Sequence, residues 1–142
     1  MIKAACHCTA VRLEIEEAPS WVLDCNCTLC RRYGALWAYY EPGKVKIVRG
    51  ADATETYVWA QRRFAFHRCK LCGCITHHTA FDTDPPRIRA VNARMMPTLD
   101  PASVRLHHTD DSHTGFFWTR AADHIEPSGD PRMAPPGPDD WR

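Results

Sequence analysis

The sequence predicts a single domain that is built mainly of β-strands and contains little helix. Short segments of alternating apolar and polar residues recur along most of the chain, and turn-forming residues separate them at short intervals. With 142 residues the chain has the size of one ordinary domain. Its apolar fraction of 44% and charged fraction of 25% are those of a soluble globular protein with its own core.

Strands are expected throughout the first half of the chain. Val11, Leu13 and Ile15 alternate with charged residues, which predicts a strand with one buried face. Apolar runs or alternation predict further strands over residues 21–24, 35–40 and 45–47. Residues 41–44 and 49–52 contain glycine next to polar residues and are expected to form turns between strands.

The second half continues the same pattern. Residues 54–59 and 63–67 predict a pair of neighbouring strands, and residues 74–80 and 88–93 predict two more, separated by the break at Asp84-Pro85-Pro86. A last strand is expected over residues 104–107. The one good helix candidate is residues 28–33, and residues 100–103 could add a single turn.

The expected domain spans residues 1–120, and residues 121–142 are expected to form a flexible tail. The tail is rich in proline and glycine and poor in apolar residues, so it cannot bury enough surface to offset the entropy of ordering.

Charge and hydropathy exclude several classes of partner. The formal net charge is +1, and no cluster of basic residues suggests a surface for nucleic acid. No apolar stretch reaches about 18 residues, so a membrane span is not expected. The first residues lack the apolar run of a secretory signal, and we therefore expect a cytoplasmic protein whose thiols stay reduced.

The most informative residues are eight cysteines in three groups: Cys6 and Cys8; Cys25, Cys27 and Cys30; and Cys69, Cys72 and Cys74. Thiols two residues apart on a strand share one face, and they lie too close for ordinary disulfide geometry. Grouped thiols suit a metal ion, which requires several thiolates at one point. The sequence therefore favours metal binding over disulfide bonds.

The segment CKLCG at residues 69–73 is a zinc knuckle. Two residues between the thiols let the chain turn around the ion, and the following glycine lets backbone N–H groups face the sulfurs. A structural zinc takes four ligands, and one knuckle supplies only Cys69 and Cys72. We expect Cys6 and Cys8 to complete this site, which would join the start of the chain to its middle.

Cys25, Cys27 and Cys30 place three thiols within six residues, enough to bind a second zinc ion. An open fourth position would make this ion labile and catalytic, since zinc lowers the pKa of a water or thiol bound there. A second structural zinc, with Cys74 or a histidine as fourth ligand, is equally compatible with the spacing. Apart from that alternative, Cys74 is expected to be a small buried residue.

Arg31 and Arg32 follow the second group directly and would add positive charge beside the ion. A small anionic thiol such as glutathione would suit that position, because arginine binds carboxylates through paired hydrogen bonds.

The cysteine motifs in their order resemble the glutathione-dependent formaldehyde-activating enzyme family, also called the centromere protein V domain family. The matching segments are CHC, CNCTLCRR and FHRCKLCGC, with VNARMM…LDPASVRLHHTDDS…W as looser support towards the end. The resemblance covers most of residues 3–118. The chain departs from the family in the first motif, which usually reads G-x-C-x-C-G, because Ala4 and Thr9 stand where the glycines are expected. The chain is also shorter than the enzyme that gave the family its name.

The resemblance implies a β-tent fold, made mostly of antiparallel sheets around a structural zinc. It implies that Cys6, Cys8, Cys69 and Cys72 hold that zinc, and that Cys25, Cys27 and Cys30 hold a labile, catalytic zinc. In the enzyme that named the family, glutathione condenses with formaldehyde to give S-hydroxymethylglutathione, and the reaction class is a carbon–sulfur lyase.

Two functions are compatible with this reading. The first is a zinc-dependent carbon–sulfur lyase-like enzyme that acts on a glutathione-type thiol adduct of a small aldehyde, with Trp37, Tyr39 and Phe64 as candidate walls of the pocket. The alternative is a non-catalytic binding module that two structural zinc ions stabilise. A nucleic-acid-binding zinc ribbon is disfavoured by the near-zero charge.

Overall fold

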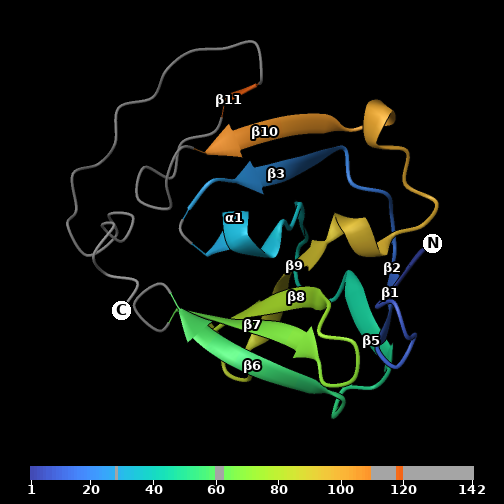
Figure 1. The fold of residues 1–142 in the computed structure, drawn as a ribbon, viewed down its shortest axis with the longest axis vertical. Coiled ribbons are helices and arrows are strands. Elements are labelled where there is room, and N and C mark those ends of the chain that lie inside the picture. Colours follow the sequence, from blue (N-terminus) through green and yellow to red (C-terminus); the bar gives the residue numbers. More distant parts are fainter. Residues whose placement is uncertain (28, 60–62, 110–117, 120–142) are drawn as a thin grey trace.

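The computed structural model describes residues 1–27, 29–59, 63–109 and 118–119 (Figure 1). The strands are β1 (Ile2–Ala5), β2 (Arg12–Ile15), β3 (Trp21–Cys25), β4 (Trp37–Tyr39), β5 (Val45–Arg49), β6 (Thr54–Trp59), β7 (Phe64–Cys69), β8 (Ile75–Ala80), β9 (Arg87–Asn92), β10 (Arg105–Thr109) and β11 (Trp118–Thr119). The helical elements are α1 (Cys30–Tyr33) and the 3-10 turns η1 (Ala93–Met95) and η2 (Pro101–Ser103). The prediction of a mainly β fold is confirmed.

The strands form two sheets. The small sheet has the order β1-β2-β5, and the large sheet has the order β11-β10-β3-β4-β9-β8-β7-β6. Pairings among the described strands are antiparallel with one exception: β10 runs parallel to β3, with Arg105 opposite Trp21 and Thr109 opposite Cys25. Parallel neighbours need a long crossover connection, and here most of the domain lies between them in the sequence.

Most element predictions agree with the structure to within a few residues. The strand expected over 54–59 is β6, and the helix expected over 28–33 is observed as α1 from Cys30; Thr28 lies outside the described residues. The sequence pattern does not predict β1, η1 or the short β11. Four residues of β1, of which only Ala4 is buried, carry too little alternation to be recognised without the partner strand β2.

Alternation along the strands of the large sheet creates two hydrophobic clusters, one on each face. Val22 of β3 and Ala38 of β4 belong to the first cluster, which also contains the buried residues of the small sheet. Leu23 and its cross-strand partner Trp37 belong to the second cluster, which contains Cys25, Cys27 and Cys30. In Figure 1, α1 lies between the β10–β3 end of the sheet and the β8–β6 end. The second face is therefore the one that carries α1 together with Cys25, Cys27 and Cys30.

Asn92, at the end of β9, joins three segments that surround the second cluster. Its buried side-chain amide donates to the Ile75 carbonyl at 2.9 Å, and its Oδ1 accepts from the backbone N–H groups of Leu36 and Arg94. The same oxygen caps η1. These bonds fix the loop that precedes β4, and thereby the position of Trp37 beside the cysteines.

Among the described residues, no helix has the length and apolar character that crossing a membrane requires. The tail expected over residues 121–142 lies outside the described residues, so the boundary at residue 120 stays a prediction.

Candidate metal centres

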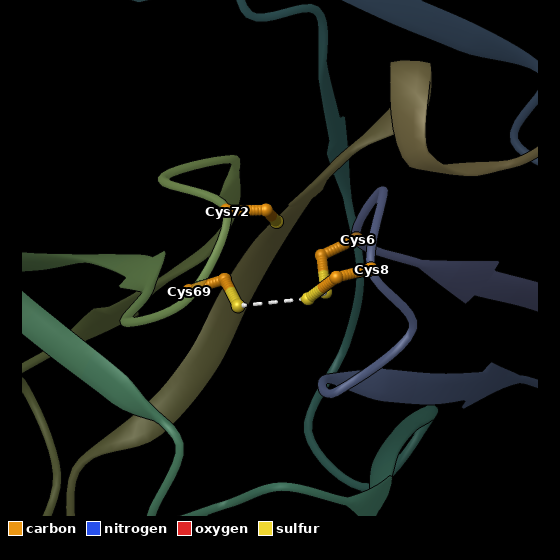
Figure 2. Close-up of side chains that lie close together, drawn as sticks. All are labelled: Cys6, Cys8, Cys69 and Cys72. Carbon is orange, nitrogen blue, oxygen red and sulfur yellow. Dashed lines mark hydrogen bonds between the residues drawn. The ribbon is translucent and has the colours of Figure 1, made fainter.

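Cys6, Cys8, Cys69 and Cys72 form one cluster, called the quartet below. Their sulfur atoms all lie within 4.8 Å of one another. Figure 2 shows that two loops supply them: the β1–β2 loop carries Cys6 and Cys8, and the β7–β8 hairpin carries Cys69 and Cys72. The structure thus brings together the four residues that the sequence proposed for one site.

The sulfur spacing in the quartet fits a metal ion better than a disulfide. The Cys6–Cys8 and Cys8–Cys69 sulfur pairs are each 3.6 Å apart. Four sulfurs held about 2.3 Å from a tetrahedral zinc ion lie about 3.8 Å apart, whereas disulfide sulfurs lie about 2.05 Å apart. The quartet therefore has the donor set and nearly the dimensions of a closed four-thiolate zinc site.

Backbone N–H groups point at the quartet sulfurs. The Val11 N–H donates to Cys6 Sγ at 3.3 Å. The pKa of Cys69 is lowered chiefly because the backbone N–H of Cys72 donates to its sulfur. The knuckle closes through a hydrogen bond from Gly73 N–H to the Cys69 carbonyl, with Gly73 at φ +74°. These donors stabilise thiolates, which are the form of cysteine that binds metal.

The expectation that the Cys-x-Cys motifs lie on strands is wrong for the first motif and holds for only one thiol of the second, since β3 ends at Cys25. Cys6 and Cys8 lie in the turn between β1 and β2, where the Thr9 N–H donates to the Cys6 carbonyl. Thr9 has φ +61°, in the left-handed region that favours glycine and disfavours a β-branched residue. The turn explains how thiols two residues apart in the sequence can face the same ion.

Cys25, Cys27 and Cys30 form the second cluster, called the trio below. Their sulfurs also lie within 4.8 Å of one another, and all three residues are buried, at 8%, 5% and 5% exposure. Cys25 ends β3 and Cys30 begins α1, so all three thiols come from one short stretch of the sequence. Within the described part of the chain, the cluster includes no fourth ligand from histidine, cysteine or a carboxylate.

Hydrogen bonds within the trio hold one sulfur as a thiolate. The pKa of Cys27 is lowered because the thiols of Cys25 and then Cys30 donate to it, and the backbone N–H of Cys30 donates to the same sulfur at 3.3 Å. The pKa of Cys30 is raised, because its thiol is the donor in hydrogen bonds with Cys25 and Cys27. Three convergent sulfurs and a stabilised thiolate fit a metal ion.

Trp37 of β4 contributes a contact with the trio that the sequence does not predict. Its indole Nε1–H donates to Cys30 Sγ at 3.2 Å, and its side chain is 1% exposed. Partners of this kind orient a ligand and tune the metal, although they do not touch the ion.

Replacing Trp37 with phenylalanine is expected to weaken zinc binding at the trio by about 10-fold or more, because the indole hydrogen bond to Cys30 is lost while the aromatic ring is kept. Competition with a chromogenic chelator measures this affinity. Trp59→Phe is the matched control, because the Trp59 indole nitrogen has no hydrogen-bond partner among the described residues. Equal affinity in the Trp37 and Trp59 variants would show that the contact does not support the ion.

Aromatic side chains of β4, β7 and β8 form a wall beside the trio, on the same face of the sheet. His78 lies among Trp37, Tyr39 and two phenylalanines, with ring centroids 4.8–5.8 Å away. Burial, followed by the charge of Arg89, lowers the pKa of His78 to about 3. Burial, followed by the charges of Cys25 and Cys30, raises the pKa of Tyr39. The wall beside the trio is therefore neutral at pH 7, with a protonated Tyr39 hydroxyl.

The two arginines that follow the trio do not share its burial. Arg31 and Arg32 lie on α1, and both are exposed although Cys30 is buried. Cys74 is partly exposed, directly before β8, and belongs to neither cluster. The expectation of a buried Cys74 is therefore only partly met, and a role for the two arginines stays a prediction.

Comparison with known proteins identifies the family that shares these cysteine clusters. A model of the glutathione-dependent formaldehyde-activating enzyme family matches residues 1–109. The crystal structure of a Rhodobacter sphaeroides protein, a structural genomics target, is similar with a TM-score of 0.62 and 30% sequence identity, covering 74% of this chain and 99% of that one. The matched region contains both cysteine clusters. The chain therefore belongs to the glutathione-dependent formaldehyde-activating enzyme family.

Proposed function

We propose that this protein is a zinc-dependent carbon–sulfur lyase-like enzyme that acts on a thiol adduct of a small aldehyde, with glutathione and formaldehyde as the pair that the family name suggests. The difference between the two clusters carries the proposal. The quartet has four thiols and can close a tetrahedron, whereas the trio has three thiols and no fourth ligand among the described residues.

In this proposal Cys25, Cys27 and Cys30 hold the catalytic zinc and the quartet holds a structural zinc. When bound at the trio, zinc acts as a Lewis acid that lowers the pKa of a thiol at its open position. A cytoplasmic location belongs to the same proposal, because the seven ligand thiols must stay reduced.

The reaction consists of addition of the substrate sulfur to the aldehyde carbon. One carbon–sulfur bond forms, the π bond of the carbonyl group breaks, and the proton lost by the thiol ends on the former carbonyl oxygen. Tyr39 packs against the hydrophobic cluster that contains the trio, and burial keeps its hydroxyl protonated. Trp37 and Phe66 exclude water from the same side, and the reverse reaction uses the same groups.

A second function, that of a non-catalytic module with two structural ions, has one observation in its favour. All three sulfurs of the trio are buried, as structural thiolates usually are. In that case both ions would exchange slowly and neither would respond to a thiol substrate.

Metal analysis combined with an activity assay tests the proposal. We expect two zinc ions per chain, of which mild chelation removes one, and the remaining protein keeps its circular dichroism spectrum. Adduct formation from glutathione and formaldehyde above the uncatalysed rate should disappear with that ion and return when zinc is added. Two ions that resist chelation equally, together with no rate above background, would favour the binding module.

A further inference from the structure

A cavity of about 660 Å³ lies beside the aromatic wall of the trio. Trp21, Tyr39 and Phe64 line it, and the same three side chains pack against the hydrophobic cluster that contains the trio. Trp21 and Tyr39 stack with their ring centroids 5.7 Å apart. The volume lies within the range of small-molecule sites, and Tyr39 contributes both to this cavity and to the surroundings of the thiols.

Arg89 of β9 lines the cavity because of an irregularity in the sheet. Along β9, Val91 pairs with His77 and Ala90 with His78, but the next pairs are Ile88 with Thr79 and Arg87 with Ala80. Arg89 is thus an extra residue with no partner on β8, which is a β-bulge. The bulge redirects its side chain, and its guanidinium lies 5.9 Å from the centroid of the Tyr39 ring.

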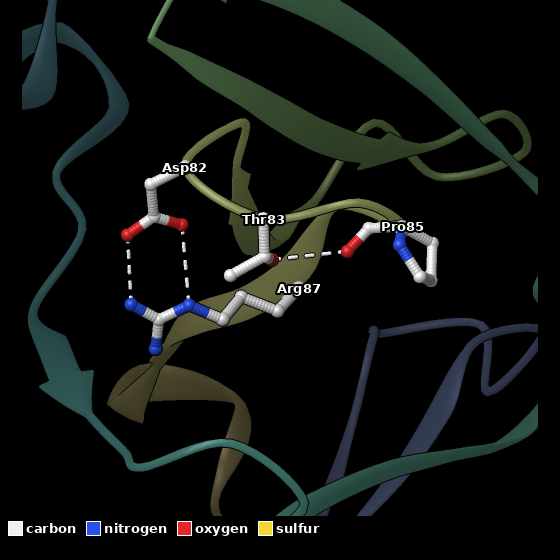
Figure 3. Close-up of polar contacts among 4 residues, drawn as sticks. All are labelled: Asp82, Thr83, Pro85 and Arg87. Carbon is white, nitrogen blue, oxygen red and sulfur yellow. Dashed lines mark hydrogen bonds and ion pairs between the residues drawn. The ribbon is translucent and has the colours of Figure 1, made fainter.

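The Arg89 guanidinium has no ion pair among the described residues, in contrast to the cations around it. Figure 3 shows Arg87, two residues earlier, in a two-pronged interaction with Asp82, at 3.1 Å from Nε and 2.7 Å from the terminal nitrogen. Lys44, also in the cavity lining, pairs with Glu16. Arg89 is therefore the lining cation whose hydrogen-bond donors remain available to a ligand.

Other polar groups around the cavity indicate what such a ligand would carry. The Tyr40 hydroxyl is buried, in a residue 7% exposed, and has no hydrogen-bond partner in the described chain. The exposed carboxylates of Glu17 and Glu41 also line the cavity. A carboxylate at Arg89 and an ammonium group near the two acidic side chains would match this pattern, and both groups occur in the zwitterionic end of an α-amino acid.

We propose that this cavity binds the α-amino-acid end of the thiol substrate and that Arg89 holds its carboxylate. The inference rests on the proposed function and assigns the residues that hold one end of its thiol substrate. Cys25 lies four residues beyond Trp21, and at about 3.3 Å per residue this is about 13 Å along the strand. A γ-glutamyl thiol, whose thiol and α-amino-acid group are many bonds apart, spans a distance of this order. Free cysteine, with both groups on neighbouring carbons, does not.

Calorimetric titration with S-methylglutathione tests the cavity separately from the chemistry, because its sulfur carries no proton to lose. We expect the zinc-loaded protein to bind it and Arg89→Gln to bind it at least 10-fold more weakly, since a charge-assisted hydrogen-bond pair is lost. Arg89→Lys should recover only part of the affinity, because lysine lacks the planar fork. Acetylation of the ligand's amino group should also weaken binding.

Arg49→Gln on β5 is the matched control, since it removes an exposed arginine from the other sheet. Zinc content and melting temperature should be equal in all variants. Equal binding by wild type and Arg89→Gln, or no binding of S-methylglutathione to the wild type, would overturn the inference. If S-methylglutathione binds through Arg89 but no adduct forms, the cavity assignment stands and the lyase proposal fails. If turnover is measurable, Arg89→Gln should raise KM and leave kcat nearly unchanged.

Discussion

Replacing Cys69 with serine is expected to remove the quartet's metal ion and to lower the free energy of unfolding by at least about 4 kcal/mol. Cys69 is 1% exposed and lies with sulfurs from both loops, so its loss removes a ligand from the ion that would link the two loops. Structural zinc binding contributes about 10–16 kcal/mol in zinc-finger peptides, whereas the net stability of native proteins in general is about 5–15 kcal/mol. A melting curve and zinc analysis of the purified variant measure both effects.

Cys74→Ser is the control for that experiment. It changes a thiol in the same hairpin that belongs to neither cluster, so its zinc content and melting temperature should stay close to those of the wild type. If Cys69→Ser keeps two zinc ions and melts with the control, the quartet does not hold the fold together.

Replacing Cys27 with serine is expected to abolish turnover, by more than about 10³-fold, while the fold survives. Cys27 is the sulfur of the trio that the hydrogen bonds hold as a thiolate, and its loss removes the second ion without touching the quartet. A metal ion supplies several kcal/mol of transition-state stabilisation, and about 4 kcal/mol corresponds to a factor of about 10³.

The adduct-formation rate, the zinc content per chain and the circular dichroism spectrum are measured for Cys27→Ser and for the control variant Cys74→Ser. One zinc ion, a native spectrum and no rate above background are the expected results. Turnover retained by Cys27→Ser would show that the trio is not the catalytic centre, whatever its metal content.

The composition of both clusters could be predicted from the sequence because metal ligands occur in short local motifs. The knuckle supplies Cys69 and Cys72 and needs two further thiols to complete a four-ligand site, and Cys6 and Cys8 are the pair without a centre of their own. The strand alternation likewise predicted which side chains of β2 are buried. Each of these patterns is carried by residues within one element.

What could not be predicted depends on how distant segments meet. Arg31 and Arg32 are next to Cys30 in the sequence, but at 3.6 residues per turn they follow it around α1 and are exposed while Cys30 is buried. Arg89 reaches the cavity through a bulge that exists only in the register between β8 and β9. The hydrogen bond from Trp37 to Cys30 likewise needs the tertiary arrangement that Asn92 fixes.

Thr9 shows how a departure from the family motif is accommodated. Thr9, at the position where the family usually has glycine, has φ +61°. Glycine adopts this left-handed conformation freely, whereas threonine adopts it at an energetic cost of about 1–2 kcal/mol. The Arg12 side chain donates to the Thr9 carbonyl and hydroxyl, which ties the strained turn to β2. The strained turn nevertheless holds Cys6 and Cys8 with their sulfurs within 4.8 Å of those of Cys69 and Cys72.

The different spans of the two clusters have a consequence for how the protein is made. Cys8 and Cys69 are 61 residues apart, whereas the trio spans six residues. Closing the longer loop costs an unfolded chain about 2 kcal/mol more, because loop entropy grows with the logarithm of length. During synthesis from the N-terminus all three thiols of the trio are translated before Cys69. The trio can therefore bind zinc while the chain is still nascent and unfolded. An ion that already binds the unfolded state contributes little to the free energy of unfolding. The quartet can close only after its last thiol has been translated, so zinc at that site drives the completion of the fold.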